Sequence, residues 1–291
     1  MDERTALTLL GGSVEGAGDD AAVVGDRVLT TDMLHERTDF PDGTTRYTAG
    51  WRSVGASLSD VAAMGADAAA AVAAYAAPAF DREELEAFVD GASDVCEAVG
   101  AEYVGGDLDE HDEFTVATTA LGETTDPVRR SGARPGDRLC VTGTLGRSGA
   151  ALRLFRRGDR ERANELFRFE PRVAAGRAAA PHATAMMDSS DGLARSVHQL
   201  AEASDCGFAV EGAAVPIDGA VDDVAADGEE RRELGLFFGE DFELVFTVPD
   251  EKLDAVRDAA HVPVTPVGTV TDESVTLDGD PMPDRGFTHG D

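Results

Sequence analysis

The sequence predicts a two-domain protein of the α/β (α+β) class, and three observations lead to that prediction. A chain of 291 residues is long enough to build two hydrophobic cores. Segments typical of strands and of helices alternate in both halves. Between the halves lies TDPVRRSGARPGDRL, residues 125–139, which is rich in proline, glycine and charge and has no hydrophobic periodicity. We therefore expect an N-terminal domain over residues 1–128 and a C-terminal domain over residues 129–291.

The first half is expected to combine five short strands with two helices. Val54, Leu58 and Val61 recur at three- and four-residue spacing, which predicts a helix over residues 44–65. A second helix is expected over residues 81–100, because an aspartate cap and acidic residues begin it and a glycine ends it. Alanine favours helices, yet the bounded segment DAAAAVAAY is expected to be a strand. The expected strands are residues 21–24, 27–34, 67–75, 101–107 and 113–122.

The second half repeats this alternation. Residues 138–143 (RLCVTG) read as a strand, and helical segments are expected from there to residue 180. Residues 183–207 have the order strand, acidic turn and helix, and residues 238–249 (FGEDFELVFTVP) form an acidic turn that enters a strand. Both halves therefore place acidic turns at the ends of regular elements.

The charge balance is unusual. The chain has 57 acidic against 25 basic residues, which gives a formal net charge of -32. Nucleic acids and anionic membranes are therefore not expected as partners, since both attract clustered positive charge. Such a surface is typical of a halophilic protein, because carboxylates keep the surface hydrated while salt screens their repulsion.

Cysteine usage and the terminus favour a cytoplasmic protein. The three cysteines are far apart and form no CxxC pair, so neither a disulfide framework nor a thiolate zinc site is expected. The start MDERTALTLL lacks the basic residues and the long apolar run of a signal peptide.

Acidic turns recur along the chain and suggest a shared metal site. They are GDD at residues 18–20, TTD at 30–32, LSD at 58–60, GGD at 105–107, DSSD at 188–191 and GED at 239–241. Carboxylate and hydroxyl oxygens are the ligands that Mg²⁺ prefers, and such sites leave room for phosphates. A single acidic turn more often caps a helix or forms a loop, so the joint pattern carries the hypothesis. We expect the Asp19–Asp20 pair to hold magnesium.

The usual phosphate-binding motifs are missing. The sequence has no G-x-x-x-x-G-K-[ST] loop, and Lys252, its only lysine, has no protein-kinase context. A phosphotransferase of this kind must neutralise phosphates with metal ions and arginine. Arg129 and Arg130 are the candidates, and for Arg129 we favour a solvated linker residue.

The ordered motifs GDDAAVV, TTDM, SLSDVAAMGA, GGD, RSGARPGD, DSSDGL and GEDFEL closely resemble the thiamine-monophosphate kinase family. That family belongs to the aminoimidazole ribonucleotide synthetase superfamily, which uses ATP without a P-loop. The resemblance covers residues 18 to about 287. It implies conversion of ATP and thiamine monophosphate to ADP and thiamine diphosphate. It also implies a homodimer paired through the N-terminal sheet, and a C-terminal domain that closes over the nucleotide.

The resemblance also implies roles for individual residues. Those expected to hold several Mg²⁺ ions are Asp20, Thr30, Thr31, Asp32, Asp60, Asp107, Asp188 and Asp191. Those expected to contact ATP are Gly106, Asp107, Arg130 and Ser190. Those expected near the thiamine end are Asp39, Glu240 and Phe287. Asp39 stands where the family typically has histidine; a carboxylate there could pair with the cationic end of thiamine but not with its phosphate.

We expect direct in-line phosphoryl transfer without a catalytic base or a phosphoenzyme, because the acceptor phosphate is itself ionised near neutral pH. Two alternatives stay open. One is an ATP-dependent cyclising synthetase of the same superfamily, and the other is a non-catalytic magnesium–nucleotide binding protein.

Overall fold

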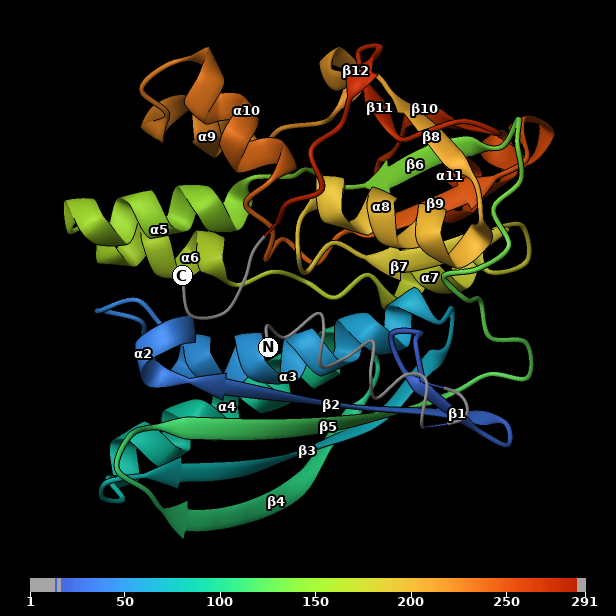
Figure 1. Cartoon of the computed structure of the whole chain (residues 1–291). Coiled ribbons are helices and arrows are strands. Elements are labelled where there is room, and N and C mark those ends of the chain that lie inside the picture. Colours follow the sequence, from blue (N-terminus) through green and yellow to red (C-terminus); the bar gives the residue numbers. More distant parts are fainter. Residues whose placement is uncertain (1–13, 15–16, 287–291) are drawn as a thin grey trace.

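The computed structural model describes residue 14 and residues 17–286. Within them the chain forms two sheets with their helices, one sheet from each half (Figure 1). β5 ends at Glu123 and β6 begins at Arg138, with irregular backbone between them. The α/β (α+β) class is therefore confirmed, while the boundary between residues 128 and 129 stays a prediction.

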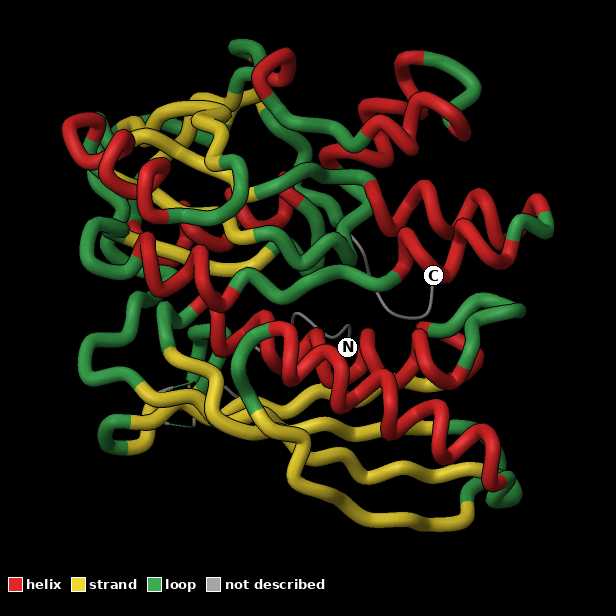
Figure 2. The backbone as a smooth tube through the Cα atoms, turned by 180° about the vertical axis from the view of Figure 1, so that it is seen from behind, coloured by secondary structure: helices red, strands yellow, loops and turns green. Residues whose placement is uncertain are grey.

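The first sheet has five strands in the order β1-β2-β5-β3-β4. β3 and β4 are parallel and the other neighbours are antiparallel. Helices α3 and α4 cover one face of this sheet (Figures 1 and 2). The elements are β1 (Ala22–Val24), β2 (Arg27–His35), α2 (Glu36–Asp39), α3 (Arg46–Ala63), β3 (Asp67–Ala77), α4 (Arg82–Ala98), β4 (Glu102–Glu110) and β5 (Thr115–Glu123).

The alanine-rich segment forms strand β3, as expected from the sequence. Ala71, Ala73 and Tyr75 are buried on the side of the sheet that faces the helices. Small side chains there let the helices lie close to the sheet. α3 and α4 also approach each other closely, since a Cβ on Gly91 would lie 2.0 Å from the Tyr47 carbonyl oxygen.

The other face of the first sheet is open. The large apolar side chains exposed on it are Val24, Leu29, Met33, Val72 and Val104, which are 37–63% exposed. Strand alternation puts Thr31 on the same face, between Leu29 and Met33 on β2.

The second sheet has seven strands in the order β12-β11-β8-β10-β6-β9-β7. β6, β7 and β9, next to one another, are almost wholly buried. The strands are β6 (Arg138–Thr142), β7 (Ala185–Asp188), β8 (Gly207–Val210), β9 (Leu244–Val248), β10 (Val264–Thr271), β11 (Thr276–Leu277) and β12 (Asp280–Pro281). The helices are α5 (Arg147–Arg157), α6 (Arg160–Phe167), α7 (Val173–Ala179), α8 (Leu193–Ser204), α9 (Gly219–Val224), α10 (Gly228–Leu236) and α11 (Leu253–Ala259), with 3₁₀ turns η1 (Gly212–Ala214) and η2 (Asp250–Lys252).

α3 lies between the two halves and contacts both. Its side chains are buried over most of its 18 residues, which is unusual for a helix at the edge of one domain. One side packs on the first sheet, and the other meets α7 and β7. The helix therefore carries its polar residues into the junction between the two halves.

Candidate phosphoryl-transfer site

Three carboxylates from distant parts of the chain meet where the two halves join. Asp20 precedes β1, Asp60 lies in the last turn of α3, and Asp188 ends β7. One oxygen from each lies within 4.8 Å of the other two. The structure thus brings together three of the residues that the sequence singled out as metal ligands.

Hydroxyl groups hold two of these carboxylates in place. The Thr30 hydroxyl donates to Asp60 at 2.5 Å, and Ser59 donates to Asp188 at 2.7 Å across the junction. The Ser190 backbone N–H also donates to Asp188, at 3.1 Å. Asp60 and Asp188 therefore keep lone pairs in a fixed direction, as a metal site requires.

Burial and neighbouring charges raise the pKa of two of these acids. Burial, and then the charge of Asp32, raise the pKa of Asp60 well above its ordinary value. Burial, and then the charge of Asp20, raise the pKa of Asp188 to about 7. A divalent cation would remove this repulsion, and an all-oxygen donor set suits Mg²⁺. The residues present therefore fit the ion that the resemblance implies.

The two arginines of the interdomain segment hold the N-terminal aspartate pair. Arg130 donates two hydrogen bonds to Asp20, from Nε to Oδ2 at 3.1 Å and from Nη2 to Oδ1 at 3.0 Å. Arg129 donates to Asp19 Oδ2 at 2.6 Å, and the Arg130 backbone N–H donates to the other Asp19 oxygen. Burial disfavours the charge of Arg130, but the contact with Asp20 and the nearby charges of Asp188 and Asp60 together outweigh it and raise the pKa of Arg130.

This arrangement corrects one expectation. Arg129 was expected to be a solvated linker residue; it is 44% exposed and yet ion-paired with Asp19. Both oxygens of Asp19 accept from the two arginines, just as both oxygens of Asp20 accept from Arg130, so the magnesium role of the Asp19–Asp20 pair stays a prediction. These two ion pairs therefore link the N-terminal half to the interdomain segment.

Other predicted metal ligands lie at different distances from this centre. Thr30 and Asp32 share the face of β2 that looks toward α3, and Ser57 donates to Asp32 at 2.6 Å. Asp191 follows Asp188 by three residues in the same turn, before α8. The structure does not bring in the Thr31 side chain, whose hydroxyl donates to the Thr118 carbonyl on the open face. Their roles as ligands stay predictions.

Gly106 and Asp107 lie on edge strand β4, away from the three carboxylates. Asp107 pairs with Ala74, an outward-facing residue, so its side chain points to the open face. A Cβ on Gly106 would lie 1.7 Å from the Ala73 carbonyl oxygen, so close strand pairing already requires glycine there. The structure therefore does not bring these two residues to the Asp20 centre within one chain.

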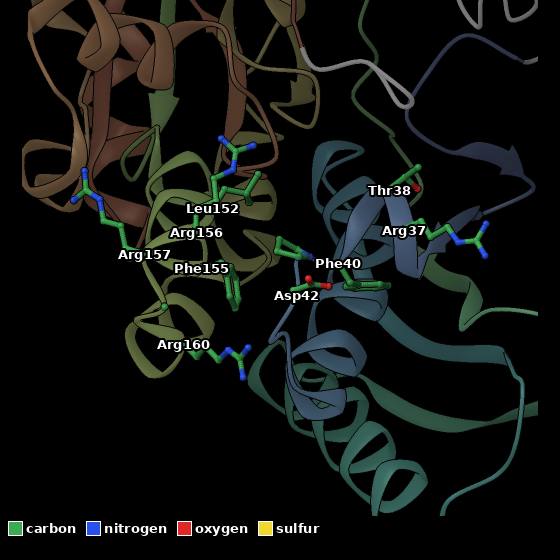
Figure 3. Close-up of a pocket in the computed structure, with 11 residues that line it drawn as sticks. Arg37, Thr38, Phe40, Asp42, Leu152, Phe155, Arg156, Arg157 and Arg160 are labelled. Atoms are coloured by element: carbon green, nitrogen blue, oxygen red, sulfur yellow. The ribbon is translucent and has the colours of Figure 1, made fainter.

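Asp39 is turned into the protein. It is 8% exposed, and its Oδ2 accepts from the His35 backbone N–H at 2.6 Å and from the Thr38 hydroxyl. Thr38, Phe40 and Asp42 instead line a cavity of about 640 Å³ between the α2–α3 loop and α5 (Figure 3). These contacts help to hold the short helix α2, and the expected role of Asp39 near the thiamine end stays a prediction.

Glu240 lies at the junction, and Phe287 lies outside the described residues. The Glu240 carboxylate is paired with Arg52 of α3, at 2.5 Å. Sequence reasoning missed Arg52 and also Asp241, whose carboxylate accepts from the Gly146 and Ser148 backbone N–H groups that begin α5. The GED motif was a signal for Asp241, whereas nothing in the sequence joins Arg52 to residue 240.

Comparisons with known proteins cover both halves of the chain. Residues 18–124 match the family model "AIR synthase related protein, N-terminal domain", and residues 134–279 match "AIR synthase related protein, C-terminal domain". Thiamine-monophosphate kinase of Halobacterium salinarum is 65% identical, over 99% of this chain and all of its own length. The Methanospirillum hungatei enzyme of the same name is 41% identical, over 99% of both chains.

A solved structure described as AaThiL complexed with AMPPCP and TMP superposes with a TM-score of 0.91 at 29% identity, covering 99% of this chain and 97% of its own. Full-length identity to curated relatives and a matching two-domain fold lead to one conclusion. This chain belongs to the thiamine-monophosphate kinase family.

Proposed function

We propose that this protein transfers the terminal phosphoryl group of ATP to thiamine monophosphate and so forms thiamine diphosphate. The observation that carries the proposal is the meeting of Asp20, Asp60 and Asp188 beside Arg130. Both substrates are anions at the reacting end, so the main barrier is their mutual repulsion. A site that gathers carboxylates for divalent cations, next to an arginine, suits that task.

Several Mg²⁺ ions, held by these carboxylates with Thr30 and Asp32, would neutralise the two phosphates and orient them. Arg130 supplies a planar guanidinium suited to bidentate phosphate contact once it leaves Asp20. Next to Asp188 in the C-terminal half, Ser190 would contact the nucleotide and Asp191 would contribute to holding the metal ions. The hydrogen bond from Thr30 holds Asp60 in position, so the site keeps its shape during phosphoryl transfer.

The acceptor oxygen of thiamine monophosphate needs no base, because a phosphate monoester is already ionised near neutral pH. The attacking and leaving oxygens can therefore lie in line without a covalent enzyme intermediate. We accordingly assign no catalytic acid or base to this chain.

We also propose a homodimer formed through the open face of the first sheet. Val24, Leu29, Met33, Val72 and Val104 give that face an apolar character unusual for a surface of so acidic a chain. Asp107 points to the same face, so its predicted metal role would be exercised at that interface. Light scattering coupled to gel filtration, in high salt, measures the mass.

We place the protein in the cytoplasm and propose that it is adapted to high salt, with 57 acidic residues against 25 basic. No helix in the described part of the chain is long and apolar enough to cross a membrane. Nucleic acid is not a proposed partner, because the net charge of -32 opposes phosphate binding over the general surface.

The deciding experiment measures ADP release from ATP in molar KCl, with and without thiamine monophosphate, and with MgCl₂ or EDTA. We expect ADP release only with thiamine monophosphate and Mg²⁺ together, and thiamine diphosphate as the second product. ADP release with the substrate of a cyclising synthetase instead, or none with either substrate, would contradict the proposal.

A further inference from the structure

Arg52 is a charged residue in the middle of α3 that no solvent reaches. Its side chain is 0% exposed and crosses the junction into the C-terminal half. Nη1 donates to the Phe167 carbonyl at 2.8 Å, and Nη2 donates to the Glu240 carbonyl at 3.1 Å and to Glu240 Oε2 at 2.5 Å. One guanidinium therefore binds both the backbone and the side chain of Glu240.

Aromatic rings enclose the rest of the guanidinium. Its carbon lies 3.7 Å from the centre of the Phe167 ring, and 5.4 Å and 5.3 Å from those of Phe169 and Phe242. Phe169 and Phe242 stack on each other at 4.2 Å. We call these three phenylalanines the aromatic box. Burying a charge costs free energy even when the charge is paired, and Glu240 is the only carboxylate partner of Arg52 among the described residues. Stability alone therefore does not account for this buried ion pair.

The loop that carries Glu240 is strained and fixed from several sides. Glu240 has φ +63° and Phe242 has φ +55°, conformations that side-chain-bearing residues rarely adopt. The Glu240 N–H donates to the Ser190 carbonyl, and Ser148 Oγ donates to the Glu240 carbonyl. Neighbouring Asp241 caps α5. Strain held in this way is typical of a site where one side chain must point in one direction.

One oxygen of Glu240 stays available. Oε2 binds Arg52, whereas Oε1 has no hydrogen-bond partner among the described residues, and the side chain is 15% exposed. Arg52 precedes Asp60 by eight residues on the same helix, so the two lie about 12 Å apart along its axis. α3 therefore sets a fixed separation between the carboxylates that would hold the reacting phosphates and the free oxygen of Glu240.

We propose that Arg52 is a positioning residue, which fixes Glu240 so that Oε1 accepts a hydrogen bond from the cationic, amino-bearing heteroaromatic end of the phosphate acceptor. This inference rests on the proposed function, because that acceptor is thiamine monophosphate. Arg52 itself touches neither substrate. Arg52 restricts the conformation of the Glu240 side chain and occupies its Oε2 atom. Substrate binding therefore does not have to order that side chain.

Steady-state kinetics on four variants test this: Arg52→Met, Arg52→Lys, Glu240→Gln and the double variant Arg52→Met/Glu240→Gln. For Arg52→Met and for Glu240→Gln we expect the KM for thiamine monophosphate to rise about ten- to a hundred-fold, the size of a lost charge-assisted contact. The KM for ATP should stay within about two-fold. Arg52→Lys should recover part of the loss, and the double variant should be no worse than the poorer single one, because both changes remove one device.

The matched control is Arg153→Met, which removes a partly buried arginine paired with Glu230 in the C-terminal half. It should leave both KM values unchanged. Trp51, the only tryptophan, donates its indole N–H to the Phe169 carbonyl, so an unchanged emission spectrum reports an intact aromatic box.

Two results would overturn the inference. One is an equal rise of both KM values in Arg52→Met with unchanged Trp51 emission, and the other is a wild-type KM for thiamine monophosphate in Glu240→Gln. Glu240→Gln keeps the inference testable if Arg52→Met does not fold. A wild-type protein that releases no ADP with thiamine monophosphate would instead overturn the proposed function.

Discussion

Replacing Asp188 with asparagine should stabilise the protein when no divalent metal is present. In the metal-free protein this buried carboxylate lies beside Asp20 and Asp60, and its pKa is raised to about 7 by burial and by the charge of Asp20. Asparagine has nearly the same shape, can still accept from the Ser190 N–H and carries no charge to bury.

The sign and size follow from the linkage between protonation and folding. The folded state keeps a proton on Asp188 that the unfolded chain loses near pH 4, so the free energy of unfolding falls as pH rises from about 4 to about 7. A rise from 3.8 to about 7 is about 3 pKa units, or at most about 4 kcal/mol. At roughly 2 °C per kcal/mol for a chain of this size, the difference in Tm above pH 7 is at most about 8 °C.

Thermal melts of both proteins in molar KCl with EDTA, between pH 5 and pH 8, measure this difference. The Asp188→Asn variant should melt higher, by a margin that grows with pH and levels off above pH 7. Adding MgCl₂ should raise the Tm of the wild type and have less effect on the variant, since binding to the folded state stabilises it.

A second variant separates charge burial from hydrogen bonding. Asp241 is also buried, with its pKa raised to about 7, first by burial. Its two oxygens accept two backbone N–H groups of α5, so Asp241→Asn would point an amide N–H at a donor and should lower the Tm at every pH. The reasoning on Asp188 is refuted if Asp188→Asn melts below the wild type at pH 8 in EDTA.

Three further outcomes are expected. Asp60→Asn should lower kcat by orders of magnitude while circular dichroism stays native; a variant that only melts would favour a structural role for Asp60. Asp39→Asn should cost about 1–3 kcal/mol of stability, measured by urea unfolding, because the carboxylate holds the His35 N–H; an increased KM for thiamine monophosphate at unchanged stability would contradict this placement. Stability should rise with KCl, because 57 acidic residues repel one another; a Tm independent of KCl would remove the case for salt adaptation.

Much of the fold followed from local pattern in the sequence. Val54, Leu58 and Val61 marked α3, and its buried face is where they lie. Strand β3 was predicted from the residues that bound the alanine-rich segment. The preference of alanine for helices would have predicted a helix, and packing within the sheet overrides that preference. Ser57 and Asp60 lie on one edge of α3, close to Asp32 and Asp188.

The rest depends on geometry that residue types do not carry. Thr31 and Asp107 sit in motifs as convincing as that of Asp20, but strand alternation turns both toward the open face. Asp39 has the same charge as Asp42, three residues later, and only the turn of α2 decides which one is buried. Arg52 pairs with a residue 188 positions away, and a lone arginine in a helix gives no sign of that.

The seam between the domains has a consequence for proteases. Trypsin cleaves after arginine, so an exposed RRSGAR segment would normally be a cleavage site that separates the two domains. Here the Arg130 N–H is bound by Asp19, the Arg129 carbonyl accepts from Met186, and the Arg130 carbonyl accepts from Ser204. A protease binds its target backbone in an extended form, free of other contacts. The bonds after Arg129 and Arg130 should therefore resist cleavage for as long as Asp19 and Asp20 stay bound to the two arginines.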